Sequence, residues 1–381
     1  MKSISISDLS ESRLEGRIEL AATVQSDNNS ERIWFRTAQV RVSPLADPFV
    51  PTVLVPAMHQ RLPLSVDGPV SPGILRSAQR VQLVKSVWDT SLVVVPIEAQ
   101  TTVTPSRESN RAVGAFFSGG VDSFYTLKRH EGEITHLIFV HGFDIPLHRL
   151  TFREQMAGEL RRIARTLNLE MVEVETNLRG YSDRYVSWDD VHGAAMAAVA
   201  HFVSPHFAKI YIPSTYANAF LVSHGSHPGL DPLWSTEFLE LVHDGAEATR
   251  FEKIEVLAAW RAAVRNLRVC WQVVEGKYNC GQCRKCLWTM AFLRACGVLD
   301  EAESFSQPLD LKALRRYPPE KLDEYARYAQ ALAAVERRGS DHELAECLRE
   351  GLERARDLRR TEQWVGKWAR RVARLRMGKR S

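Results

Sequence analysis

Aromatic residues lead into two glycines and then into a helix-like segment at Phe116-Phe117-Ser118-Gly119-Gly120-Val121-Asp122-Ser123-Phe124-Tyr125-Thr126-Leu127. Glycines let the backbone approach a ligand closely, amide N–H groups converge at such a turn, and a helix N-terminus adds partial positive charge. The stretch therefore predicts an anion site between a buried strand and a helix, with pyrophosphate as its natural ligand.

The polar side chains of this loop suit phosphate binding. Ser118 and Ser123 carry hydroxyls that can donate to phosphate oxygens, and Asp122 is placed to hold a metal ion or to orient water. The loop is not of the Walker type, because no Gly-Lys-Ser/Thr follows the glycines. The alternative is an ordinary glycine turn in which Asp122 or Ser123 caps a helix. The complete Ser-Gly-Gly-x-Asp-Ser string after a strand favours the phosphate loop.

Short apolar strands alternate with longer helical segments around this loop, which is typical of a parallel sheet with crossover helices. The expected strands are 112–117, 136–140, 170–174 and 209–213, and the expected helices are 123–130, 151–167 and 191–203. The fold class is therefore α/β, with a doubly wound parallel-sheet nucleotide-binding core at 111–299. Such a sheet binds ligands where the carboxyl ends of its strands meet helix N-termini.

The flanking regions differ from this core. Residues 1–105 predict a β-rich N-terminal domain, with strands at 17–24, 32–42, 50–55 and 91–99, a helix at 71–88 and a polar linker at 101–111. Residues 300–381 predict a helical, basic C-terminal extension, because 351–381 holds eleven Lys/Arg against three Asp/Glu in a chain of net charge +4. Its segment 364–375 could bind nucleic acid or anionic lipid, or dock its tryptophans on the protein itself.

Four of the six cysteines fall within seventeen positions, namely Cys270, Cys280, Cys283 and Cys286. Cys-x2-Cys-x2-Cys with a fourth cysteine upstream suits tetrahedral Zn²⁺. We expect a structural site, since four sulfurs leave no open position for substrate. An iron–sulfur cluster and unliganded buried cysteines are the alternatives.

The phosphate loop, followed about 150 residues later by the four-cysteine array, resembles the 7-cyano-7-deazaguanine synthases of queuosine biosynthesis. These belong to the N-type ATP pyrophosphatase, or PP-loop, superfamily. The resemblance covers about 111–299 and implies an adenine nucleotide alpha hydrolase-like fold with ATP, Mg²⁺ and Zn²⁺ as cofactors. It also implies an enzyme that cuts ATP into AMP and pyrophosphate while adenylating a carboxylate. In that family ammonia then gives an amide, which a second ATP helps to dehydrate to a nitrile.

The resemblance also implies roles for individual positions. Its catalytic positions correspond to Ser118, Asp122, Ser123 and Lys253. Its nucleotide-binding positions correspond to Phe117, Ser118, Gly119, Gly120, Val121, Asp122, Ser123, Phe124, Tyr125, Thr126 and Leu127, and we add His141 at the end of the second expected strand. Its zinc ligands correspond to Cys270, Cys280, Cys283 and Cys286.

The chain departs from this family where the acceptor should be recognised. Val140-His141-Gly142-Phe143-Asp144 replaces an Asp-Tyr-Gly-Gln type of sequence, and the stretches 214–218 and 223–229 replace a Ser-Gly-Tyr-Pro-Asp stretch. Histidines gather near this expected carboxyl edge at 141, 192, 224, 227 and 243. Any of them could accept a proton from an amine nucleophile, or could be an ordinary surface or core histidine.

We therefore expect a cytoplasmic, adenylate-forming carbon–nitrogen ligase that acts on a small-molecule carboxylate or carbonyl and on ammonia or an amine. The alternatives are a tRNA-modifying PP-loop enzyme, another amide-forming ligase from a defence or nucleotide-modification cluster, and a non-catalytic nucleotide-binding scaffold. No apolar run reaches the roughly 18 residues needed for a membrane span. A nucleic-acid or protein acceptor and a homo-oligomer stay open.

Overall fold

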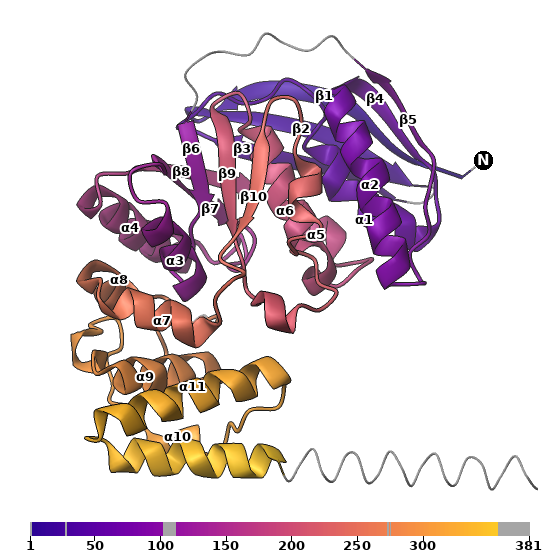
Figure 1. Ribbon diagram of the computed structural model, residues 1–381. Coiled ribbons are helices and arrows are strands. Elements are labelled where there is room, and N and C mark those ends of the chain that lie inside the picture. The colour runs from indigo at the N-terminus through magenta and orange to yellow at the C-terminus, as the bar shows by residue number, and fades with distance from the viewer. Residues whose placement is uncertain (1, 27–28, 102–111, 273, 275, 357–381) are drawn as a thin grey trace, which may run out of the picture. The chain divides into compact units, whose positions relative to one another are not determined.

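The computed structural model describes residues 2–26, 29–101, 112–272, 274 and 276–356 (Figure 1). The chain forms two compact units, residues 1–247 and 248–381. Most of the expected linker, at 102–111, lies outside the described residues, as does the basic segment at 364–375.

A single sheet runs through the first unit in the order β10-β9-β6-β7-β8-β3-β2-β1-β4-β5. Its described strands are β1 (Ile4–Leu14), β2 (Arg17–Ser26), β3 (Asn29–Thr37), β4 (Leu64–Val70), β5 (Ile97–Thr101), β6 (Ala112–Phe116), β7 (His136–His141), β8 (Glu170–Thr176), β9 (Phe207–Pro213) and β10 (Glu240–Asp244). Strand β2 is antiparallel to β1 and β3, and β3 is antiparallel to β8. The other neighbouring strands pair in parallel, so the sheet is mostly parallel.

The strands β6 to β10 form the parallel core of this sheet. From β6 the chain moves outward to β7 and β8, then crosses back to place β9 and β10 on the other side of β6. This reversal is the topological switch of a doubly wound sheet, and ligands bind at the carboxyl ends of the strands beside it. The predicted α/β class is confirmed, and β10 is a strand that the sequence pattern did not predict.

The N-terminal strands extend the same sheet. Phe35 and Arg36 of β3 pair with Thr176 and Glu175 of β8. Asn177 continues this pairing, because its side chain accepts from the Trp34 N–H at 2.9 Å and donates to a backbone oxygen of β3 at 2.8 Å. The β-rich N-terminal region is therefore joined edge to edge with the parallel core.

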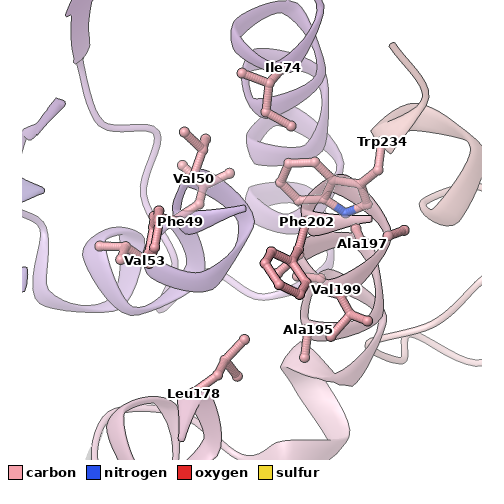
Figure 2. Packing of buried hydrophobic residues seen from close by; sticks show 14 of the residues in the cluster. Phe49, Val50, Val53, Ile74, Leu178, Ala195, Ala197, Val199, Phe202 and Trp234 are labelled. Atoms are coloured by element: carbon pink, nitrogen blue, oxygen red, sulfur yellow. The ribbon is translucent and has the colours of Figure 1, made fainter. Parts of the chain in front are cut away.

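Helices cover both faces of the sheet (Figure 1). One face carries α3 (Val121–Arg129) and α4 (Leu150–Thr166), and the other carries α1 (Phe49–Gln60), α2 (Pro72–Trp88), α5 (Leu178–Ser182) and α6 (Trp188–Phe202). The second face holds a large apolar core in which Phe49 of α1, Phe202 of α6 and Trp234 lie close together (Figure 2). Helices α2, α3, α4 and α6 confirm the helices predicted at these positions.

The strand predicted at 50–55 is wrong, because these residues lie in helix α1. Ten of its twelve residues are buried, so the segment lacks the polar face that gives a helix its periodicity, and its valines are typical of a buried strand. The strand predicted at 91–99 is also displaced, since β5 begins only at Ile97.

The second unit is helical in its described part. It contains α7 (Arg250–Ala258), α8 (Arg261–Asn266), α9 (Arg284–Cys296), α10 (Leu311–Leu314) and α11 (Leu322–Arg338), and 342–356 are helical as well. Aromatic rings hold α7, α9 and α11 together, because Phe292 contacts Phe251 and Tyr328 edge to face. The segment between α8 and α9 carries Cys270, Cys280 and Cys283, and Cys286 lies in the first turn of α9.

Candidate functional site

The Ser118-Gly119-Gly120 turn connects β6 to α3 beside the switch of the sheet. Gly119 has φ +74°, a left-handed conformation that favours glycine, and Gly120 is the N-cap of α3. Gly120 N–H approaches Ser118 Oγ at 3.4 Å, and Ser123 Oγ donates to Gly120 O at 3.0 Å. The turn thus directs the first amides of a nine-residue helix toward the carboxyl edge of the sheet.

Much of the predicted nucleotide-binding segment is apolar core. Phe117 and Phe124 are buried and meet edge to face with ring centroids 5.0 Å apart. Val121 and Leu127 are buried as well. These residues can face a nucleotide only through their backbone, so their side chains fix the position of the turn.

Asp244, at the end of β10, anchors helix α3. Its buried carboxylate accepts from Thr126 Oγ1 at 2.8 Å and from Arg129 Nη1 at 2.9 Å, and it lies 2.9 Å from His130 Nε2. The hydroxyl of Thr126 is therefore used within the protein. Asp244 was not among the predicted site residues, because the sequence pattern did not predict the strand that it ends.

Tyr125 makes a second contact between α3 and the segment after β10. Its hydroxyl donates to Glu247 at 2.7 Å. Burial and this hydrogen bond raise the pKa of Tyr125 to about 12, so the phenol stays protonated at neutral pH. The predicted loop residues thus divide into a glycine turn that faces the sheet edge and side chains that hold α3 in place.

His141 lies at the carboxyl end of β7, as predicted, but its ring is held on the side of α4. Its Nε2 is 2.9 Å from Glu173 Oε2, and Arg153 approaches its Nδ1 at 3.4 Å. Burial acts to raise the pKa of Glu173, but hydrogen bonds from His141 and Arg161 outweigh it and lower that pKa to about 2. The imidazole lines a cavity of about 410 Å³ between β3, β8 and α4.

The four predicted zinc ligands converge in the second unit. All four cysteines are buried and free of disulfides, and their sulfurs lie within 4.8 Å of one another. Two sulfur pairs, Cys270 with Cys283 and Cys280 with Cys286, are each 3.8 Å apart. A zinc tetrahedron with Zn–S bonds of about 2.3 Å has edges of about 3.8 Å, whereas a disulfide is about 2.05 Å long. The geometry fits a four-thiolate zinc ion.

The surroundings of the sulfurs support this fit. Backbone N–H groups of Gln282 and Cys283 point to Cys280 Sγ at 3.5 and 3.3 Å. Cys283 is also the N-cap of α9, so the positive end of that helix faces the cluster. Phe305 packs against the cysteines and shields them.

Asn279 is a supporting residue that sequence reasoning missed. Its side-chain oxygen accepts from the N–H groups of Val269 and Cys270 at 2.9 and 3.2 Å. Its side-chain nitrogen donates to the oxygens of Leu267 and Ser304 at 2.8 and 3.1 Å. This buried amide ties the first cysteine to the other three, and its position beside Cys280 was the signal available in the sequence.

Two other predicted positions can be placed. Lys253 is a buried residue of α7 in the second unit. Asp122 lies in the first turn of α3, half-buried.

Among the described residues, the four cysteines are the one group of three or more His, Cys, Asp or Glu side chains that could hold a metal ion. Mg²⁺ is usually bound by only one or two protein carboxylates together with phosphate oxygens of a substrate, so a magnesium site need not form such a group. Magnesium binding by Asp122 therefore stays a prediction.

Four of the five predicted histidines lie together on the opposite face of the sheet from α3, around the buried Asp231. They are His192, His224, His227 and His243, and we refer to them with Asp231 as the histidine cluster. Lys85 of α2 lies beside them and donates to Asp190 O at 2.6 Å. Sequence reasoning missed the contribution of α2, because that helix is more than 100 residues away along the chain.

Comparison of the chain with protein-family models, curated proteins and solved structures gave no match. Of the helices in the described part of the chain, none has both the length and the apolar character to cross a membrane.

Proposed function

We propose that this protein activates a carboxylate with ATP, forming an acyl adenylate and pyrophosphate, and then transfers the acyl group to ammonia or an amine. The observation that carries the proposal is the Ser118-Gly119-Gly120 turn at the switch of a doubly wound sheet. The left-handed conformation of Gly119 and the N-terminus of α3, which follows it, are suited to binding the β- and γ-phosphates. No P-loop lysine follows to hold the γ-phosphate.

In the proposed reaction a carboxylate oxygen attacks the α-phosphorus and the bond to the β-phosphate breaks. The amine nitrogen then attacks the acyl carbon, and AMP leaves with the electrons of the carbon–oxygen bond. The contribution of the protein is mainly positioning and electrostatic stabilisation of the departing pyrophosphate. The cysteine site is structural in this scheme, because four thiolates leave zinc no open position.

The acceptor is proposed by resemblance alone, so 7-carboxy-7-deazaguanine is the first probe. A protein or tRNA acceptor and another small carboxylate are the other acceptors to test. A non-catalytic scaffold is the competing account, since it would bind ATP without forming an adenylate.

Exchange of labelled pyrophosphate into ATP tests the proposal, because only a reversible adenylation produces it. We expect exchange that depends on the carboxylate. Ser118→Ala should slow exchange by about 10²-fold if its hydroxyl stabilises the transition state in a dry site. Ser12→Ala, on strand β1, is the matched control and should retain full exchange. ATP binding without exchange, across the carboxylate, RNA and protein acceptors, would leave only the scaffold.

A further inference from the structure

The histidine cluster contains a hydrogen-bonded pair with the geometry of a general base. Asp231 begins a short 3-10 helix, Asp231–Trp234, and its Oδ2 lies 2.7 Å from His243 Nδ1. Ser226 Oγ donates to the same oxygen at 2.6 Å. The side chains of His243 and Asp231 are 3% and 0% exposed, so this contact is shielded from water.

The pairing determines where the imidazole keeps its lone pair. A carboxylate only accepts, so Nδ1 of His243 carries the hydrogen and the neutral ring leaves Nε2 as the base. That Nε2 is buried and has no hydrogen-bond partner among the residues that the structure describes. Asp231 Oδ1 and His224 Nδ1 are also buried, and neither has a partner in the described part of the chain. Because buried polar atoms are nearly always paired, these three atoms have hydrogen-bonding capacity left for a ligand or for water.

The groups around His243 suit a proton acceptor. Burial and the neighbouring His224 lower the pKa of His192 to about 4, and burial lowers the pKa of His224 and His227. These neighbours are therefore uncharged at neutral pH and do not oppose the arrival of a proton. Burial also lowers the pKa of Lys85, the cation that α2 brings to the cluster.

The sheet register places His243 and the glycine turn at the same carboxyl edge of the sheet, with β9 between their two strands. Tyr211 of β9 pairs both with Ala115 of β6 and with Val242 of β10, so these three residues form one row across the sheet. Two strand spacings make that row about 10 Å long. Ser118 lies in the turn after β6 and His243 lies in β10, and these two strands flank β9 at the carboxyl edge.

We propose that His243 is the general base of the amide-forming step and that Asp231 is its positioning residue. The inference rests on the proposed function. As the amine attacks the acyl carbon and AMP departs, the proton of the amine nitrogen passes to His243 Nε2, which gives it to water after the amide leaves. Because Nε2 is buried in the free protein, the residues that cover it must move before the acyl adenylate and the amine can reach it.

The test separates adenylation from acyl transfer in the full chain. With ATP, 7-carboxy-7-deazaguanine and ammonium, His243→Gln should keep pyrophosphate exchange while amide formation falls by about 10²-fold or more. Asp231→Asn should show the same split with a smaller loss. Hydroxylamine, a free base at neutral pH, should restore much of the acyl transfer in both variants. His59→Gln, an exposed histidine of α1, is the control and should retain both activities.

Retained exchange also shows that a variant has folded around its ATP site. Equal losses of exchange and amide formation would make the pair structural and overturn the base role, as would full amide formation by His243→Gln. Absence of exchange and of AMP in the unaltered chain would overturn the proposed function, and the base role with it.

Discussion

Single backbone positions hold the carboxyl edge of this sheet in shape. Gly142 follows β7 with φ +100°, and a Cβ there would lie 2.1 Å from Thr176 O of β8. Gly132 has a similar φ of +87° but open space around a Cβ. Comparing substitutions at the two glycines therefore separates the cost of backbone strain at positive φ from the cost of a steric clash.

We expect Gly142→Ala to destabilise the protein by about 3 kcal/mol or more, and Gly132→Ala by only about 1 kcal/mol. An alanine is strained at the positive φ of either position, whereas Gly142→Ala must also displace strand β8. Urea unfolding of both variants measures the difference. Equal losses would contradict the close approach of Gly142 to Thr176.

Asp47 gives a pH-dependent prediction. It is 3% exposed, and burial raises its pKa from 3.8 to about 6, although it accepts the Ser71 N–H at 2.8 Å. A raised pKa means that the folded state holds the proton more tightly. The contribution of Asp47 to stability is thus full below pH 3.8 and is lost as the pH rises to about 6.

Asp47→Asn cannot ionise, so its stability relative to the unaltered chain should increase between pH 4 and pH 6. The increase is at most about 3 kcal/mol and should level off above pH 6.5. Unfolding free energies across this range measure it. A difference that does not change with pH would show that Asp47 is not a desolvated acid.

At the scale of elements, strand β10 fixes both candidate sites of the first unit from opposite faces. Asp244 holds α3, the helix that follows the glycine turn, and its neighbour His243 points to Asp231. Successive side chains of a strand face opposite sides of a sheet, so one strand end can serve both. Strand β10 therefore supplies one residue that holds α3 and one residue of the histidine cluster.

Asp244→Ala should destabilise the protein by about 2–4 kcal/mol, because it leaves Thr126 and Arg129 without their buried acceptor. Glu247→Gln is the control. Its carboxylate also contacts Arg129 but is 48% exposed, so we expect a loss below about 1 kcal/mol. Denaturant unfolding compares the two, and a smaller loss for Asp244→Ala would contradict its role as the anchor of α3.

At the scale of the whole chain, the second unit should depend on its metal. Three of the four clustered cysteines lie in the irregular segment between α8 and α9, and the fourth lies in the first turn of α9. Only three apolar side chains pack against them, so a bound ion would supply much of the local stability. We expect elemental analysis to find one zinc per chain. Cys283→Ser should lose the zinc and most of the soluble protein, and Cys296→Ala, outside the cluster, should keep both. Folded, metal-free protein would refute the structural role.

The sequence predicted features that depend on local pattern. Alternating strands and helices indicated the doubly wound core, and close spacing indicated the cysteine site. Pairing over long distances was not predictable: β3 joins β8 across about 140 residues, and Asp231 meets His243 only because a short helix packs on β10. Helix α1 was misread because burial on all sides removes its periodicity.

We propose that this chain cleaves ATP at the α-phosphorus. Chromatography of the products from ATP labelled at the α-phosphate tests it most directly, with 7-carboxy-7-deazaguanine and ammonium as the first acceptor pair. We predict that the label appears in AMP, with pyrophosphate released in equal amount. Accumulation of labelled ADP, with AMP absent, would contradict the account.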